Sequence, residues 1–167
     1  LTIRGSSNLK SSSYRENKGS AQCKSSVIFA GMRSNGTTII KANKSRNHTE
    51  LLSKYLKLPI TIKNKKNYDE IRVKKVKIIK PLNYIIPSDI SSSAFFIVLT
   101  ALSKNSELII KNVNVNPSRI GIITILKEMG IAISYNNLRL YKGEKISDIN
   151  IKSPKLIKPI NCPSKLN

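Results

Sequence analysis

The feature that most constrains the fold is an internal repeat, because the same order of expected helices and strands occurs twice, about 70 residues apart. Each copy reads helix, strand, helix and then short strands, with a further strand leading in. Helices and strands in so short a unit must cover each other's apolar faces, which predicts an α/β fold built from two similar units. Since a unit of about 60 residues buries little apolar surface, we expect both units to belong to something larger.

The first copy is outlined by residues that begin or end helices. Ser20 has the side chain of an N-cap, and Pro59 ends the second helix. The expected elements are a strand at Leu1–Arg4, a helix at Ser20–Met32, a strand at Thr37–Ile40, a helix from about Arg46, and strands between Ile60 and Ile79 that break near Lys65–Asn67.

The second copy follows a proline-bounded segment, Pro81–Pro87, which we take as the boundary between the units. Asn116 followed by Pro117 reads as an N-cap with proline in the first turn, and Gly130 as the end of that helix. The expected elements are a strand at Tyr84–Ile86, a helix from Ser88–Asp89 to Leu99, a strand at Leu108–Ile110, a helix from Asn116 to Gly130, strands at Ile131–Tyr135 and Leu138–Tyr141 around an Asn136–Asn137 turn, and a strand at Asp148–Lys152.

The charge of the chain raises nucleic acid as a partner, because the formal net charge is +21 and the pI is about 10.2. The composition weakens this interpretation, since Ile, Lys and Asn, which share A/T-rich codons, supply 66 of the 167 residues. Lysine outnumbers arginine by 23 to 7 and tryptophan is absent, whereas nucleic-acid readers favour arginine forks and aromatic platforms. A basic nucleic-acid-binding module stays as an alternative only.

The residues that hold metals or form disulfide bonds are scarce. Cys23 and Cys162 are too few and too far apart for a disulfide framework or a zinc site, and His48 is the single histidine. We therefore expect no metal, and the low cysteine content fits a reducing cytoplasm. The longest apolar stretch, Ala94–Leu102, is far shorter than the ~20 residues that span a membrane.

Five segments, in order along the chain, carry motifs of one enzyme family. Gly19–Ser25 resembles a Ser-Ala-Gln-Val-Lys-Ser helix, and Ser45–Glu50 resembles a Ser-Arg-Asp-His-Thr-Glu segment. Ile86–Phe96 is similar to Val-Pro-Gly-Asp-Ile-Ser-Ser-Ala-Ala-Phe-Phe, while Asn116–Arg119 and Leu126–Gly130 resemble Asn-Pro-Thr-Arg and Leu-Lys-Glu-Met-Gly. Any one match is weak, but five in register are similar to the 5-enolpyruvylshikimate-3-phosphate synthases.

The resemblance implies a two-lobed α/β fold of six βαβαββ units, three in each lobe. About two of the six units would be present here. Residues 1–84 would be the last unit of the first lobe, and residues 85–167 the first unit of the second lobe. Because the chain begins with Leu1 rather than Met, we expect it to be an internal fragment.

The resemblance also implies an activity of the complete enzyme. The family transfers the enolpyruvyl group of phosphoenolpyruvate to the 5-hydroxyl of shikimate 3-phosphate, releases phosphate and uses no cofactor. We expect a cytoplasmic enzyme that is a monomer when complete. The family's catalytic aspartate, its Lys-Glu pair and two anion-binding arginines would come after Asn167, and a substrate-gripping lysine before Leu1, so the chain alone is expected to be inactive.

The same resemblance implies five substrate-binding residues. Ser20 and Ala21 would bind the phosphate of shikimate 3-phosphate, and Gln22 would contact the shikimate ring and the phosphoenolpyruvate side. Arg46 would grip the same phosphate, beside Ser45 at a second helix N-terminus. Hydroxyls, cations and helix N-termini are the groups that bind such anions.

Each candidate also has a plainer structural interpretation. Ser20 would cap a helix, Arg46 would be a surface cation, and His48 would pack or cap. Lys24, one turn after Ser20, would either help to hold phosphate or complement the helix face. Asp89 is interpreted as an N-cap rather than a catalytic carboxylate. For the whole chain, a second alternative is a non-catalytic remnant whose repeat survives as a packing unit only.

Overall fold

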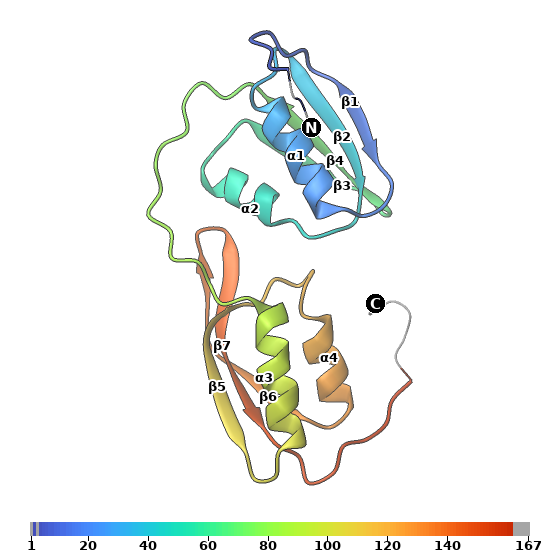
Figure 1. Ribbon diagram of the computed structural model, residues 1–167, viewed down its shortest axis with the longest axis vertical. Coiled ribbons are helices and arrows are strands. Elements are labelled where there is room, and N and C mark those ends of the chain that lie inside the picture. The colour runs from blue at the N-terminus through green and yellow to red at the C-terminus, as the bar shows by residue number, and fades with distance from the viewer. Residues whose placement is uncertain (1, 3, 162–167) are drawn as a thin grey trace. The chain divides into compact units, whose positions relative to one another are not determined.

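Two sheets, each covered by helices, make up the chain in a computed structural model that describes residues 2 and 4–161 (Figure 1). The chain divides into two units, Leu1–Leu82 and Asn83–Asn167, close to the expected boundary after residue 84. Within the described residues, no helix is long and apolar enough to cross a membrane.

The first unit has the complete βαβαββ order. Its elements are β1 (Ser13–Glu16), α1 (Ala21–Gly31), β2 (Thr37–Asn43), α2 (His48–Tyr55), β3 (Ile60–Asn64) and β4 (Tyr68–Lys74). The strand order is β1-β2-β4-β3, with β1 parallel to β2 and β4 antiparallel to both of its neighbours. Alternate residues of β2 and β4 are buried, as expected for a sheet with one covered face.

The core of the first unit lies between α1 and the sheet. Its buried residues are Ile28, Met32, Ile40, Ala42, Ile71, Val73 and Val76. Gly31 allows a close approach of α1 to the sheet, because a Cβ atom at this position would lie 3.0 Å from Thr38 Cβ and 3.3 Å from Val73 Cβ. The fold therefore needs the absence of a side chain at the last residue of α1.

The second unit repeats this plan with a shortened first strand. Its elements are α3 (Ile90–Leu102), β5 (Glu107–Asn114), α4 (Gly121–Glu128), β6 (Ala132–Tyr141) and β7 (Glu144–Lys152). The antiparallel sheet has the order β5-β7-β6, which corresponds to β2-β4-β3 of the first unit. In place of a first strand, Ser88 alone forms a parallel bridge with Val113.

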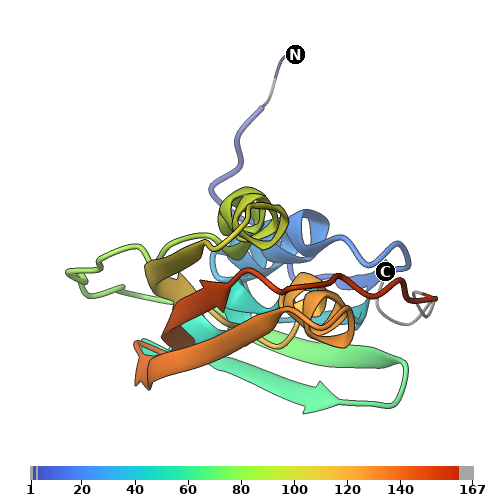
Figure 2. The ribbon, with the colours of Figure 1, turned by 90° about the horizontal axis from the view of Figure 1, so that it is seen from below.

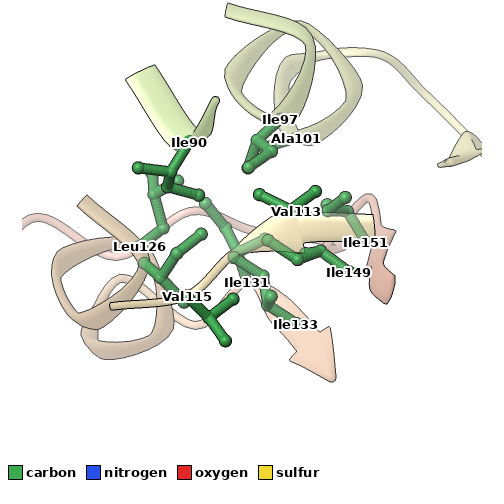
Figure 3. Packing of buried hydrophobic residues seen from close by; sticks show 11 residues of the cluster. Ile90, Ile97, Ala101, Val113, Val115, Leu126, Ile131, Ile133, Ile149 and Ile151 are labelled. Carbon is green, nitrogen blue, oxygen red and sulfur yellow. The ribbon is translucent and has the colours of Figure 1, made fainter. Parts of the chain in front are cut away.

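A second hydrophobic core joins α3 and α4 to this sheet. Figure 2 shows α3 on one side of the strands, and Figure 3 shows isoleucine and valine side chains of helices and strands converging. Ile97 and Ile149 belong to this core and have no exposed surface. The remaining buried residues are Ile90, Ala101, Val113, Val115, Ile123, Leu126, Ile131, Ile133 and Ile151.

The expectation of a strand at Tyr84–Ile86 is wrong, and so is the part of the Leu1–Arg4 expectation that the structure describes. Leu1 and Ile3 lie outside the described residues, Thr2 and Arg4 are not in a strand, and the first strand of the unit is β1. Tyr84–Ile86 is irregular, and the Ile85 N–H donates to the Tyr141 hydroxyl at 3.0 Å instead of to a neighbouring strand. An apolar run is not a strand unless another strand meets its backbone groups.

Two further expectations in the second unit are also wrong. Asn116 caps a turn rather than a helix: its side-chain oxygen accepts from the Ser118 N–H at 2.9 Å, and α4 begins at Gly121. The Asn136–Asn137 segment does not separate two strands, because β6 runs through it with a register shift, and Asn137 has a φ of 54°. The asparagines make a bulge where a turn was expected.

Candidate functional site

The site begins at the N-terminus of α1, where the expected cap is confirmed. Ser20 has an extended backbone, and its hydroxyl accepts from the Cys23 N–H at 3.2 Å. No acidic residue occupies the first turn. The N–H groups of Ala21 and Gln22 belong to the first turn, whose N–H groups have no partner within the helix. This end of α1 therefore favours an anion.

Glu16, at the end of β1, orders the loop between β1 and α1, which ends at the N-cap Ser20. The Glu16 side chain is buried and accepts from the Lys18 N–H at 2.7 Å and the Gly19 N–H at 2.8 Å. Burial alone would raise the pKa of Glu16, but the N–H groups of residues 18 to 20 and the charge of Lys24 outweigh it, so the pKa is lowered. An ionised carboxylate thus fixes the turn before α1.

The second part of the site, after the N-terminus of α1, is the loop between β2 and α2. The helix begins at His48 rather than near Arg46, and the Leu51 N–H donates to the carbonyl oxygen of its cap, Asn47, at 3.0 Å. Ser45 therefore lies before the cap and not in the first turn. Among residues 2 and 4–161, no acidic side chain forms an ion pair with the Arg46 guanidinium.

A cavity of about 170 Å³ lies between α1 and the segment that leads into α2. It brings together three of the five residues predicted to bind substrate, Ala21, Gln22 and Arg46. Ser20 and Ser45 do not line it. Its remaining lining residues are Ser25, His48 and Thr49. The combination of a helix N-terminus and an arginine suits a small anion such as a phosphate group.

Lys24 is buried and does not line the cavity. Its side chain has no exposed surface, and its Nζ atom is 2.7 Å from Glu50 Oε1. The same Nζ donates to the carbonyl oxygen of Arg46 at 2.9 Å. The interpretation that Lys24 complements an exposed helix face is therefore wrong, and Lys24 is not among the residues that line the cavity.

Sequence reasoning missed the buried acids around this site. Glu50 lies in the matched Ser45–Glu50 segment, but nothing in that motif indicates that Glu50 is buried against Lys24. Glu16 is preceded by a hydrophilic segment with no motif of its own. The one available signal was the position of Glu50 in the first turn of a helix, where carboxylates are favoured.

In the second unit, the N-cap interpretation of Asp89 is confirmed. Its carboxylate accepts from the Ser92 N–H at 3.0 Å and lies 2.9 Å from Arg119 Nη2, which also donates to the Ser91 hydroxyl at 2.6 Å. Burial would raise the pKa of Asp89, but the Ser92 N–H and the Arg119 charge lower it. Asp89 and Arg119 thus secure the start of α3.

No group of three or more His, Cys, Asp or Glu side chains in the described part of the chain could hold a metal ion. Cys23 is a free, exposed thiol, and Cys162 lies outside the described residues.

Comparison with known proteins decides the family. The sequence model of EPSP synthase (3-phosphoshikimate 1-carboxyvinyltransferase) matches residues 1–162. The chain belongs to this family. The resemblance carried by the five motifs is thereby confirmed.

Two relatives and a solved structure illustrate the similarity. The 3-phosphoshikimate 1-carboxyvinyltransferase of Caldicellulosiruptor saccharolyticus is 40% identical over 157 residues, which cover 93% of this chain and 36% of that protein. The corresponding protein of Thermoanaerobacter sp. is 41% identical over 159 residues, with the same coverage of 93% and 36%. The structure of the EPSP synthase from Acinetobacter baumannii matches with a TM-score of 0.82 and 34% identity, covering 95% of this chain and 36% of that one.

The chain therefore spans about a third of the length of the EPSP synthases that it matches, since 36% of each is covered. The expected α/β fold of βαβαββ units is confirmed: the first unit shows the full order of elements, and the solved EPSP synthase matches over 95% of this chain.

Proposed function

We propose that this chain carries part of the shikimate 3-phosphate site of an enzyme that transfers the enolpyruvyl group of phosphoenolpyruvate to the 5-hydroxyl of shikimate 3-phosphate, with release of phosphate. Such an enzyme belongs to the shikimate pathway of aromatic amino acid biosynthesis. Its relatives carry the name 3-phosphoshikimate 1-carboxyvinyltransferase. We further propose that residues 1–84 are the last unit of one lobe and residues 85–167 the first unit of the other.

The observation that carries the proposal is the cavity between α1 and α2. Its lining holds the first turn of α1, through Ala21 and Gln22, together with Arg46. Backbone N–H groups and a guanidinium can hold different oxygens of one phosphate group. Ser20 would support phosphate binding by fixing the first turn of α1, because its hydroxyl accepts a hydrogen bond from the Cys23 N–H. Ser45 would support it through its position in the loop that carries Arg46.

The role proposed for this chain is binding, without a catalytic residue. Holding an anionic substrate in reacting geometry lowers the barrier by making the encounter of the two reactants unimolecular. Because we propose no catalytic residue in it, the 167-residue chain alone is expected to bind shikimate 3-phosphate without turnover. We propose a cytoplasmic enzyme that acts as a monomer and needs no cofactor.

The test compares the affinity of the chain for shikimate 3-phosphate and for shikimate. The phosphorylated ligand should bind more tightly, and Arg46→Ala should remove about 10- to 100-fold of that preference, the equivalent of a charged hydrogen bond worth about 1.5–3 kcal/mol. Arg33→Ala is the matched control, because it removes an equal charge from an exposed position after α1.

Equal affinity for both ligands would remove the proposed phosphate site. A different result would favour the basic nucleic-acid-binding module. In that case the affinity for DNA would fall steeply as the salt concentration rises, and Arg46→Ala and Arg33→Ala would lower this affinity equally.

A further inference from the structure

Lys24 is an unusual residue to find with no exposed surface in a unit of this size. Lysine is almost never fully buried unless its charge is paired. Its neighbours on α1, Gln22 and Cys23, are exposed, so the chain places an ammonium group inward at a position where an apolar side chain would pack without desolvation cost.

The contacts of Lys24 connect two separate elements. From α1, its Nζ atom reaches Glu50 Oε1 in the first turn of α2 at 2.7 Å. The same atom donates to the carbonyl oxygen of Arg46, in the loop before α2, at 2.9 Å. Lys24 is thus hydrogen-bonded to the backbone of Arg46, a residue that lines the cavity.

A buried ion pair is weak evidence for stability, because well-packed apolar residues in its place are often equally stable or more stable. What an apolar pair cannot supply is a donor for the Arg46 carbonyl group. The specific consequence of Lys24 is therefore a fixed backbone position for Arg46 relative to the N-terminus of α1.

We propose that Lys24, held by Glu50, is a positioning residue that presents Arg46 to the phosphate of the substrate. The inference rests on the proposed function of the cavity and deepens it. Lys24 acts through Arg46 and does not touch the ligand, since it has no exposed surface and does not line the cavity.

The experiment uses the double variant Lys24→Met/Glu50→Leu in the whole chain. Both charges of the pair are removed together, so neither partner stays buried without the other, and the free energy of unfolding in urea should stay near or above that of the wild type. The affinity ratio of shikimate 3-phosphate to shikimate should nevertheless fall by about 5- to 10-fold, because the loop loses its fixed position.

The control for a merely structural effect is Val73→Ala, which leaves a cavity in the core of the same unit. This variant should be less stable and keep its affinity ratio. Arg46→Ala should change the ratio less in the double variant than in the wild type, because both changes act on one contact. If the apolar pair does not fold, Lys24→Gln/Glu50→Gln, which keeps a polar pair without the reach of lysine, is measured with the same expectation.

The outcomes separate the two claims. If Arg46→Ala lowers the ratio in the wild type but the double variant keeps it, or if the two effects are fully additive, the positioning role is overturned while the phosphate site stands. If Arg46→Ala leaves the ratio unchanged in the wild type, the phosphate site fails and the positioning role fails with it.

Discussion

At the scale of single residues, a few buried charges shape the candidate site, while most of the chain's lysines do not. Glu16 fixes the turn before α1, and Lys24 with Glu50 fixes the loop before α2. Glu16 accepts from the N–H groups of Lys18 and Gly19, and Lys24 donates to the carbonyl group of the cavity-lining residue Arg46. The excess of positive charge in the composition therefore does not indicate where the candidate site lies.

The lowered pKa of Glu16 predicts a pH dependence of stability. A carboxyl group whose folded pKa lies below its ordinary value of 4.5 stabilises the folded state above that value, and this stabilisation is lost as the pH falls through the folded pKa. The difference in unfolding free energy between the wild type and Glu16→Gln should therefore be constant above about pH 5.5 and shrink below about pH 4.5.

Carbon-13 NMR of the Glu16 carboxyl group measures its titration directly, and urea unfolding at several pH values measures the difference. A carboxyl midpoint above 4.5, or a stability difference that persists unchanged to pH 3, would contradict the account of the turn.

The residues of the site were partly predictable from sequence. Ala21, Gln22 and Arg46 lie in short motifs, and the structure brings them to one cavity. Glu16 and the burial of Lys24 were not predictable, because the environment of a charged side chain depends on which distant element packs against it. Ser45 was expected at a helix N-terminus because α2 was expected to start at about Arg46, two residues before its observed start at His48.

At the scale of elements, capping residues predicted helices well and apolar runs predicted strands less well. Ser20 and Asp89 accept the hydrogen bonds that their positions suggested. Asn116 did not begin a helix, since the same side chain also closes a turn, and local sequence does not distinguish the two. Tyr84–Ile86 did not form a strand, because pairing depends on a neighbour supplied by the rest of the fold.

The packing of α1 against its sheet predicts the effect of one methyl group. Gly31→Ala should lower the free energy of unfolding by about 1–2 kcal/mol, because overpacking against Thr38 and Val73 outweighs the gain in helix propensity. Gly5→Ala is the matched control, since a Cβ atom there meets no atom within 4 Å.

Urea unfolding of both variants tests this packing. A Gly31→Ala variant as stable as Gly5→Ala would mean that α1 can move away from the sheet at no cost.

At the scale of the whole molecule, the chain consists of two repeats with separate hydrophobic cores. The sequence pattern predicted this division, because each repeat carries its own caps and its own apolar alternation. The pattern did not reveal that the second repeat reduces its first strand to the single bridge of Ser88 with Val113.

Because the two cores are separate, a substitution in one core should destabilise only the unit that contains it. Ile97→Ala should destabilise the second unit by about 2–5 kcal/mol, because it leaves a cavity at a fully buried position. Hydrogen exchange followed by mass spectrometry should show faster exchange in residues 83–161 and unchanged exchange in residues 4–82. Faster exchange throughout the chain would show that the two units unfold as one.

We propose that the cavity between α1 and α2 binds the phosphate of shikimate 3-phosphate. An NMR titration of the nitrogen-15-labelled chain with that ligand and with shikimate tests this binding residue by residue. Shikimate 3-phosphate should shift the N–H signals of Ala21, Gln22 and Arg46, and shikimate should shift them much less. Equal shifts with both ligands, or shifts confined to other residues, would contradict this proposal.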